Sequence, residues 1–97
     1  MSKVLVRYYG VLREIAKKKE EKFEVESDSS LSDLIEQISK KNGPRFQNFV
    51  FDEKGDLREG LAFAADGSSL ERAHLDRTKS NSISEFVILP PISGGRF

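Results

Sequence analysis

The pattern of hydrophobic and polar positions along the start of the chain predicts two strands separated by a helical segment. Residues 3–9 (KVLVRYY) are rich in β-branched and aromatic side chains and end at Gly10, as a strand does. In residues 11–15 (VLREI) the apolar positions have helical spacing. Residues 23–26 (FEVE) alternate between apolar and acidic side chains, which predicts a second strand with one solvated face.

The strongest helical pattern covers residues 31–41. Ser30 precedes it as an N-cap, and Asp33 follows three positions later, as in a capping box. Residues 42–44 (Asn-Gly-Pro) mark its end, because glycine terminates helices and proline cannot continue them. One apolar stripe at positions i, i+3, i+4 and i+7 predicts the buried side of this helix: Leu31, Leu34, Ile35 and Ile38.

The next segment predicts further strands. The aromatic run at residues 47–51 (QNFVF) indicates a short strand, followed by a turn at residues 54–55 (Lys-Gly). Residues 60–65 (GLAFAA) indicate another strand, which residues 66–67 (Asp-Gly) close with a turn.

The last third of the domain is less regular until its final strand. Residues 68–82 fit no single period and are expected to form a polar loop or a helical turn within residues 70–75. Residues 86–89 (FVIL) are apolar on both faces, as in a central strand, and Pro90 ends that strand because it lacks an N–H group. The order of these elements predicts an α+β domain in which one main helix covers a mixed sheet.

Composition narrows the class of protein. Ninety-seven residues with 37% hydrophobic side chains are enough for one small domain with one core. Sixteen basic and sixteen acidic residues give no net charge, so nothing in the balance favours a nucleic-acid partner. The chain contains no cysteine, no signal-peptide pattern and no apolar run long enough to span a membrane, so we expect a soluble cytoplasmic protein without membrane contact.

Motifs for catalysis are weak inside the domain. His74 is the one histidine, and no G-x-S-x-G nucleophile elbow is present. The glycines do not form a phosphate-binding loop, and no set of residues has the spacing of a metal site. We therefore interpret His74 as an exposed loop residue and expect neither a metal nor a bound cofactor in this chain.

The C-terminal sequence PPISGGRF, residues 90–97, is the most distinctive motif. Pro90 and Pro91 favour an extended chain that leads away from the last strand. Gly94 and Gly95 have no Cβ atom, so their backbone can enter a narrow slot in another protein. The motif predicts a protruding tail whose bare main chain is presented to a partner.

This ending, EFVILPPISGG, together with the opening KVLVRYYGVLREIA and the helix LSDLIEQISKK, resembles the MoaD/ThiS group of ubiquitin-like sulfur carriers. The resemblance is greatest to the small subunit of molybdopterin synthase. It implies a β-grasp fold over residues 1–91, with residues 92–97 as a flexible tail. It also implies a carrier subunit that acts with partner enzymes, so whether the chain is itself an enzyme stays open.

The resemblance further implies the chemistry of the tail. A MoeB-type adenylating enzyme, which itself uses ATP and Mg²⁺, would activate the carboxylate of Gly95, and the adenylate would then be converted to a thiocarboxylate. The large subunit of molybdopterin synthase would be the acceptor partner. The preceding residues would bind the partner and direct the tail: Pro90, Pro91, Ile92, Ser93 and Gly94.

One departure from the family pattern is that Arg96 and Phe97 follow Gly95. The Gly95 carbonyl is therefore part of a peptide bond, so a protease is expected to cut between Gly95 and Arg96 before activation. Three alternatives stay open: a protein modifier joined to lysines through Gly95, an interaction module in which Phe97 is an apolar anchor, and a tail without function. The sulfur pathway and the oligomeric state also stay open.

Overall fold

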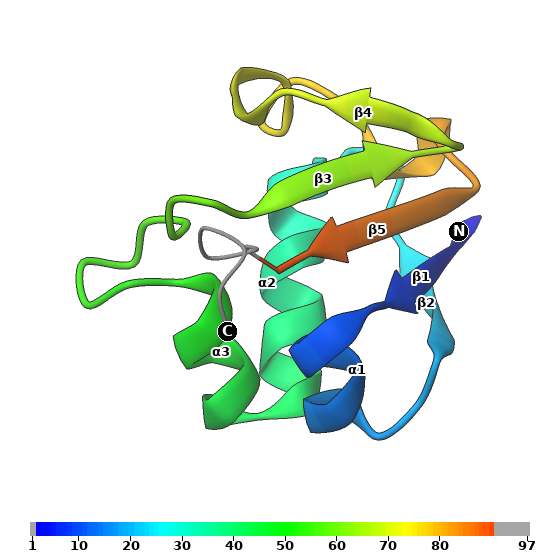
Figure 1. Ribbon diagram of the computed structural model, residues 1–97. Coiled ribbons are helices and arrows are strands. Elements are labelled where there is room, and N and C mark those ends of the chain that lie inside the picture. Colours follow the sequence, from blue (N-terminus) through cyan, green and yellow to red (C-terminus); the bar gives the residue numbers. More distant parts are fainter. Residues whose placement is uncertain (1, 91–97) are drawn as a thin grey trace.

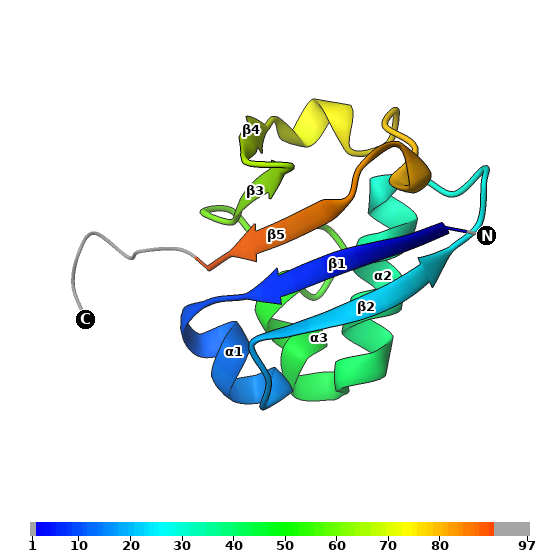
Figure 2. The same ribbon diagram turned by 90° about the vertical axis from the view of Figure 1, so that its right-hand side faces the viewer.

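The computed structural model describes residues 2–90 as a five-stranded sheet with three α-helices on one side (Figures 1 and 2). The predicted tail, residues 92–97, lies outside the described residues, as does Pro91 at the end of the predicted domain. The strands are β1 (Ser2–Tyr8), β2 (Glu20–Val25), β3 (Ala62–Ala65), β4 (Ser68–Leu70) and β5 (Glu85–Leu89). The helices are α1 (Gly10–Ala16), α2 (Leu31–Asn42) and α3 (Pro44–Val50), with short 3-10 helices at η1 (Arg72–His74) and η2 (Ser80–Ser82).

The sheet has the order β2-β1-β5-β3-β4, and β1 and β5 form its parallel centre. The pairs β1–β2, β3–β5 and β3–β4 are antiparallel. The last strand of the chain is therefore inserted between the first strand and β3, which is the arrangement of a β-grasp domain. The predicted α+β class, mixed sheet and central position of β5 are confirmed.

Helix α2 follows the sequence pattern closely. Asp33 N–H donates to Ser30 Oγ at 3.2 Å, and Ser30 N–H donates to Asp33 Oδ2 at 3.0 Å, which completes the predicted capping box. The apolar stripe of α2 belongs to the same buried core as the inward residues of β1 and β5, and Figure 2 shows α2 behind these two strands. All four predicted stripe residues are at most 1% exposed: Leu31, Leu34, Ile35 and Ile38.

Helix α3 corrects the predicted strand at residues 47–51. Gly43, at φ +95°, ends α2, and Pro44 begins a new helix at a first-turn position, where its missing N–H costs nothing. Phe46 and Val50, four positions apart, are fully buried on one side of α3. Three helices therefore cover the sheet instead of one main helix. None of the helices within residues 2–90 has the length and apolarity of a membrane span.

The irregular segment after β3 begins with a hairpin. Asp66 and Gly67 have φ values of +50° and +85° and form the predicted two-residue turn between β3 and β4. Asp66 Oδ1 also accepts hydrogen bonds from the backbone N–H groups of Ser84 and Glu85, at 3.0 and 2.9 Å. The turn therefore fixes the start of β5. The helical turn expected within residues 70–75 is η1.

Candidate functional site

The end of β5, where the chain leaves the sheet, is paired with a strand on each side. Strand β5 pairs with β1 as far as Ile88, opposite Tyr8, and with β3 as far as Leu89, opposite Ala62. Pro90 follows and is half-buried. The domain thus fixes the position from which the tail begins. Pro90 is the one predicted site residue that the structure places; the others lie outside the described residues: Pro91, Ile92, Ser93, Gly94, Gly95, Arg96 and Phe97.

Gly10, at the start of α1, packs close to Pro90. Its φ of +56° lies in the left-handed region, and a Cβ atom at this position would lie 3.1 Å from Pro90 Cγ. A glycine therefore allows α1 to begin directly beside the root of the tail. The sequence showed Gly10 as the end of a strand but did not indicate its contact with a residue eighty positions away.

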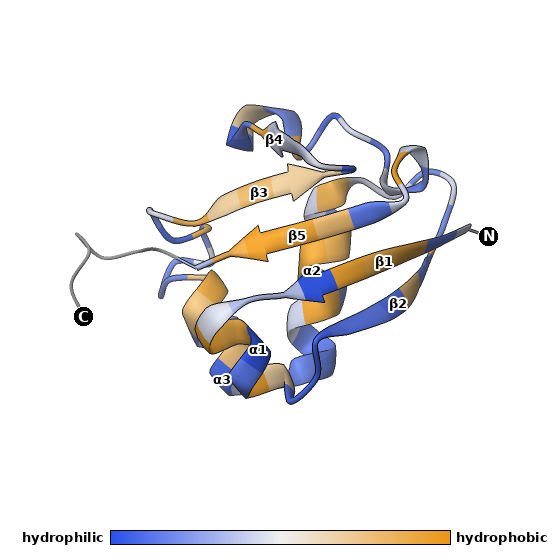
Figure 3. Ribbon diagram, turned by 45° about the vertical axis from the view of Figure 1, so that its right-hand side comes forward, coloured by the Kyte–Doolittle hydropathy of each residue, from blue (hydrophilic) through white to orange (hydrophobic). Residues whose placement is uncertain are grey.

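The sheet face opposite the helices carries an apolar patch that we call the open face. It contains alternate residues of the three inner strands, while the intervening residues belong to the buried core. Figures 2 and 3 show this face of the sheet with the helices on its far side. Most of its side chains are half-buried, and the patch extends along β5 to the root of the tail. The open face consists of Leu5, Ala62, Ala64, Val87 and Leu89.

A polar margin borders the open face near the end of β1. Arg7 forms ion pairs with Glu85 and, at 3.8 Å, with Glu20. A hydrogen bond to Tyr9 and the charge of Glu85 raise the pKa of Arg7 above its ordinary value. Tyr9 itself is 42% exposed, the large hydrophobic residue most open to solvent among residues 2–90. An apolar centre with arginine and tyrosine at its border is typical of a protein-binding surface.

A buried hydrogen-bond network fixes β1 behind this surface. Tyr8 Oη donates to Glu21 Oε1 at 3.2 Å and accepts from Asn42 Nδ2 at 3.1 Å. Burial raises the pKa of Tyr8 well above its ordinary value. Burial also opposes ionisation of Glu21, but Lys41 and Lys18 together lower the pKa of that carboxyl. The network joins β1, β2 and α2, and so holds the strand beside β5 in place.

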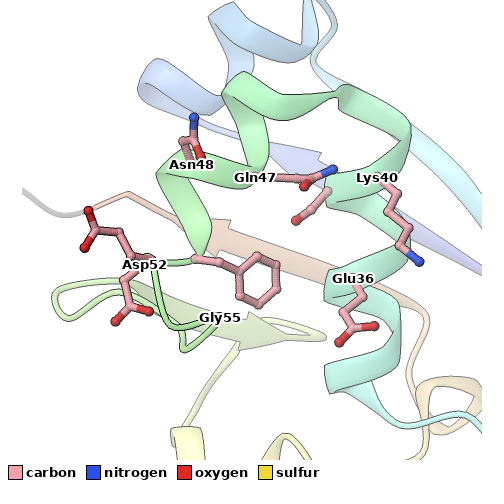
Figure 4. A pocket seen from close by; sticks show the side chains of 9 residues that line it. Glu36, Lys40, Gln47, Asn48, Asp52 and Gly55 are labelled. Atoms are coloured by element: carbon pink, nitrogen blue, oxygen red, sulfur yellow. The ribbon is translucent and has the colours of Figure 1, made fainter.

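A hollow with a volume of about 390 Å³ lies between α2, α3 and the loop that follows α3. Figure 4 shows Glu36 and Lys40 on α2, Gln47 on α3 and Asp52 in the loop. Ser39 lines the same hollow, and its buried Oγ has no hydrogen-bond partner among the described residues. Charges of both signs border the hollow without a nucleophile and base in contact, so the geometry gives no reason to assign it a catalytic role.

His74 has the position expected from the sequence. It is exposed at the end of η1, where its backbone N–H donates to Glu71 O at 2.9 Å. Within residues 2–90, no three histidine or carboxylate side chains gather into a group that could hold a metal ion. The residues to which the resemblance assigns the chemistry, from Gly95 onward, lie outside the described part of the chain.

The sequence pattern of the ThiS family matches residues 6–95 of this chain. The match covers nearly the whole domain and ends at Gly95, so Arg96 and Phe97 fall beyond it. A comparison with curated protein sequences found no match.

Solved structures share the fold over almost the entire chain. SAMP1 from Haloferax volcanii is 20% identical, with a TM-score of 0.82 over 97% of this chain and 100% of its own. The small archaeal modifier protein 1 from Methanosarcina acetivorans is 27% identical, with a TM-score of 0.77 over 98% of both chains. A putative molybdopterin converting factor, subunit 1, from Pyrococcus furiosus is 26% identical, with a TM-score of 0.67 over 94% of this chain and 99% of its own.

Proposed function

Because the chain belongs to the ThiS family of small ubiquitin-like proteins, we propose that it is a sulfur carrier similar to the small subunit of molybdopterin synthase, with Gly95 as its reacting residue. The observation that carries this proposal is the extent of the family match, which ends at Gly95 although the chain continues. Arg96 and Phe97 are then an extension that must be removed. The β-grasp domain supports the proposal because the end of β5 is held between two strands and is followed by Pro90, which lies beside Gly10.

The proposed chemistry begins with hydrolysis of the peptide bond between Gly95 and Arg96 by a processing protease. Water supplies the new carboxylate oxygen of Gly95, and Arg96 leaves with a free amine. The carboxylate then attacks the α-phosphorus of ATP, and pyrophosphate departs. A sulfide-level sulfur nucleophile attacks the acyl carbon of this adenylate and displaces AMP. The product is a Gly95 thiocarboxylate, and no step requires a group from residues 2–90.

In this proposal the described domain binds and directs the tail while partners supply the catalysts. A MoeB-type adenylating enzyme would provide the ATP site and Mg²⁺, and the large subunit of molybdopterin synthase would accept the sulfur. The open face is the surface offered to these partners, because it is apolar, is covered by no helix of residues 2–90, and extends to the end of β5. Pro91, Ile92, Ser93 and Gly94 would occupy the partner's slot.

A second candidate function is that of a protein modifier. The small archaeal modifier protein 1 from Methanosarcina acetivorans is 27% identical over 98% of this chain, which favours this candidate. The adenylate would form in the same way, but the amine of a lysine on another protein would displace the leaving group and form an isopeptide bond with Gly95. The two candidates share every residue of the tail and differ in the nucleophile.

ATP–pyrophosphate exchange with a MoeB-type enzyme tests the shared first step. We expect exchange with a chain that ends at Gly95 and none with the full chain, because the latter has no Gly95 carboxylate. In the Gly95-terminated chain, Gly95→Ala should impair exchange without changing the melting temperature, because the added methyl group would crowd a narrow slot. Equal exchange by the 1–97 and 1–95 chains would contradict the proposal. Tighter partner binding by the full chain, without exchange by either, would favour an interaction module anchored by Phe97.

The two acyl-transfer candidates are separated by what the activated chain becomes in cells. A carrier accumulates as a free thiocarboxylate, whereas a modifier appears in higher-mass species that survive denaturation. Mass spectrometry of those species would locate lysines joined to Gly95. Conjugates in wild-type cells that disappear with Gly95→Ala would favour the modifier.

A further inference from the structure

A small cleft opens between α3 and the loop that leads into β3. It has a volume of about 370 Å³ and is lined by Arg45, Asn48, Phe49 and Arg58. Phe49 is half-buried and packs against the core with its inner side, while it also forms a wall of the cleft. Two exposed arginines therefore stand beside an aromatic ring in one concave site.

The second arginine of this pair is held in place by the fold. Arg58 Nε donates to the backbone carbonyl of Asn48 at 2.6 Å, and Arg58 N–H donates to Val50 O at 2.9 Å. Arg58 O in turn accepts a hydrogen bond from the guanidinium of Arg72. Holding a guanidinium in position before a ligand arrives reduces the entropy lost on binding.

The charge of the cleft is not neutralised within the domain. Among residues 2–90, the acidic side chains form ion pairs with Arg7, Lys18 and Lys41 but with neither Arg45 nor Arg58. Asn48 adds no charge, so the walls of the cleft are apolar and cationic. This combination is complementary to an apolar side chain flanked by carboxylates.

The cleft lies at the end of the molecule from which the tail leaves. Arg58 is four residues before Ala62, and Ala62 is paired with Leu89 at the end of β5. Four residues of chain span at most about 14 Å. Helix α1, which begins beside Pro90, packs against α3. A protein that takes hold of the tail would therefore also be within reach of the cleft.

We propose that this cleft is a docking site for an acidic segment, carrying one apolar side chain, of the protein that receives the tail. The apolar side chain packs on Phe49, and its flanking carboxylates pair with Arg45 and Arg58. The identity of the tail-receiving partner rests on the proposed function, but the binding chemistry of the cleft does not. The cleft is also distinct from the open face, which lies on the other side of the sheet from α3.

The test titrates the isotope-labelled full chain by NMR with a capped peptide of four glutamates around one leucine. We expect saturable shifts at the backbone amides of Asn48 and Phe49 and at the Arg58 Nε–H, and weaker binding as salt rises. Arg45→Glu should lower the affinity at least about tenfold, equivalent to about 1.4 kcal/mol. Arg13→Glu, the same charge reversal on the exposed surface of α1, is the matched control and should change the affinity much less.

Four results would overturn the proposal. Equal binding of a peptide with lysines in place of the glutamates would exclude charge recognition. Shifts confined to other surfaces, or no saturable binding, would exclude the cleft as the site. Binding by the Gly95-terminated chain but not by the full chain would show that the segment after Gly95 occupies the cleft itself. Shifts that follow protein concentration without peptide would instead indicate a second copy of the chain.

A separate assay distinguishes failure of this site from failure of the proposed function. In pyrophosphate exchange with the Gly95-terminated chain, Arg45→Glu should raise the KM for the carrier about tenfold and leave kcat unchanged. An unchanged KM beside a positive peptide titration would contradict the partner assignment. No exchange by the unsubstituted Gly95-terminated chain would contradict the proposed function alone, because the peptide titration does not depend on adenylation.

Discussion

The two faces of the sheet are formed by the same strands, but one is covered by helices and the other is open. On the covered face, Phe86 and Ile88 of β5 are fully buried against α2 and the inward side chains of β1. On the open face, Val87 and Leu89 of the same strand are only half-buried, although they are equally apolar. The strand is thus apolar on both sides, but the helices cover only one of them.

This difference separates stability from binding. Burial of apolar surface on the helix side stabilises the fold by roughly 25 cal/mol per Å² removed from water. The apolar side chains of the open face gain that energy only when another surface covers them. We therefore expect substitutions on the covered face to change folding and substitutions on the open face to change association.

Phe86→Ala should produce the largest effect. The side chain is 0% exposed and stacks on Phe63 with ring centroids 6.1 Å apart, so its removal leaves a cavity in the core. We expect a loss of about 3–5 kcal/mol in the free energy of unfolding. Urea denaturation with Val87→Ala as the matched neighbour would measure it; equal losses for the two variants would mean that the faces do not differ as described.

Val87→Ser should change partner binding more than stability, the opposite of what we expect for Phe86→Ala. The side chain is half-buried at the centre of the open face, opposite Arg7 on one side and Ala64 on the other. We expect the KM for a Gly95-terminated carrier in pyrophosphate exchange to rise about tenfold, with a much smaller change in unfolding free energy. An unchanged KM would remove the open face from the partner interface.

Gly10→Ala tests the packing at the end of β5, where Gly10 lies beside Pro90. The substitution places a methyl group 3.1 Å from Pro90 Cγ and forces a non-glycine residue into the left-handed region, at a cost of about 1–2 kcal/mol or more. Gly55→Ala is the control, because Gly55 has φ +87° but nothing within 4 Å of its Cβ position. Thermal denaturation should show a larger loss for Gly10→Ala, together with reduced activation; equal losses would contradict the packing against Pro90.

The smallest effect is expected from Tyr8→Phe, at about 1 kcal/mol near neutral pH, because the hydroxyl bonds Glu21 and Asn42. Its pH dependence has a defined sign. The pKa of Tyr8 is raised by folding, so its contribution is complete below the unfolded value of about 10 and is lost as pH rises above it. The unfolding free energy of Tyr8→Phe should fall less steeply than that of the parent above about pH 10, and identical slopes would contradict the shift.

At acidic pH, the pH dependence of the unfolding free energy includes a contribution from Glu21. Its pKa is lowered in the folded state, so its contribution is present above the unfolded value of about 4.3 and is lost as pH falls below that value.

Much of the fold followed from local patterns. Ser30, Asp33 and the apolar stripe of α2 act within one helix, so their spacing predicted both its limits and its buried side. Helix α3 was missed because the aromatic residues of QNFVF favour strands by propensity. The packing of Phe46 and Val50 against the core overrides that propensity, and Pro44, which the sequence pattern assigned to the end of α2, is instead the first residue of α3.

Some features of the candidate site could likewise be predicted from local sequence, and others could not. The paired prolines and glycines of the tail are visible in sequence, and alternation in β5 already places Val87 and Leu89 on the opposite face from Phe86 and Ile88. The proximity of Gly10 to Pro90 and the position of Phe49 and Arg58 in one cleft arise from tertiary packing between segments without a common period. Such contacts require the fold to be known.

The most direct test of the central claim, that Gly95 becomes the reacting terminus, is the intact mass of this protein isolated from its own cells. The proposal predicts a species that ends at Gly95, part of it with sulfur in place of a terminal carboxylate oxygen. A protein that retains Arg96 and Phe97 throughout, in cells where sulfur transfer is active, would contradict it.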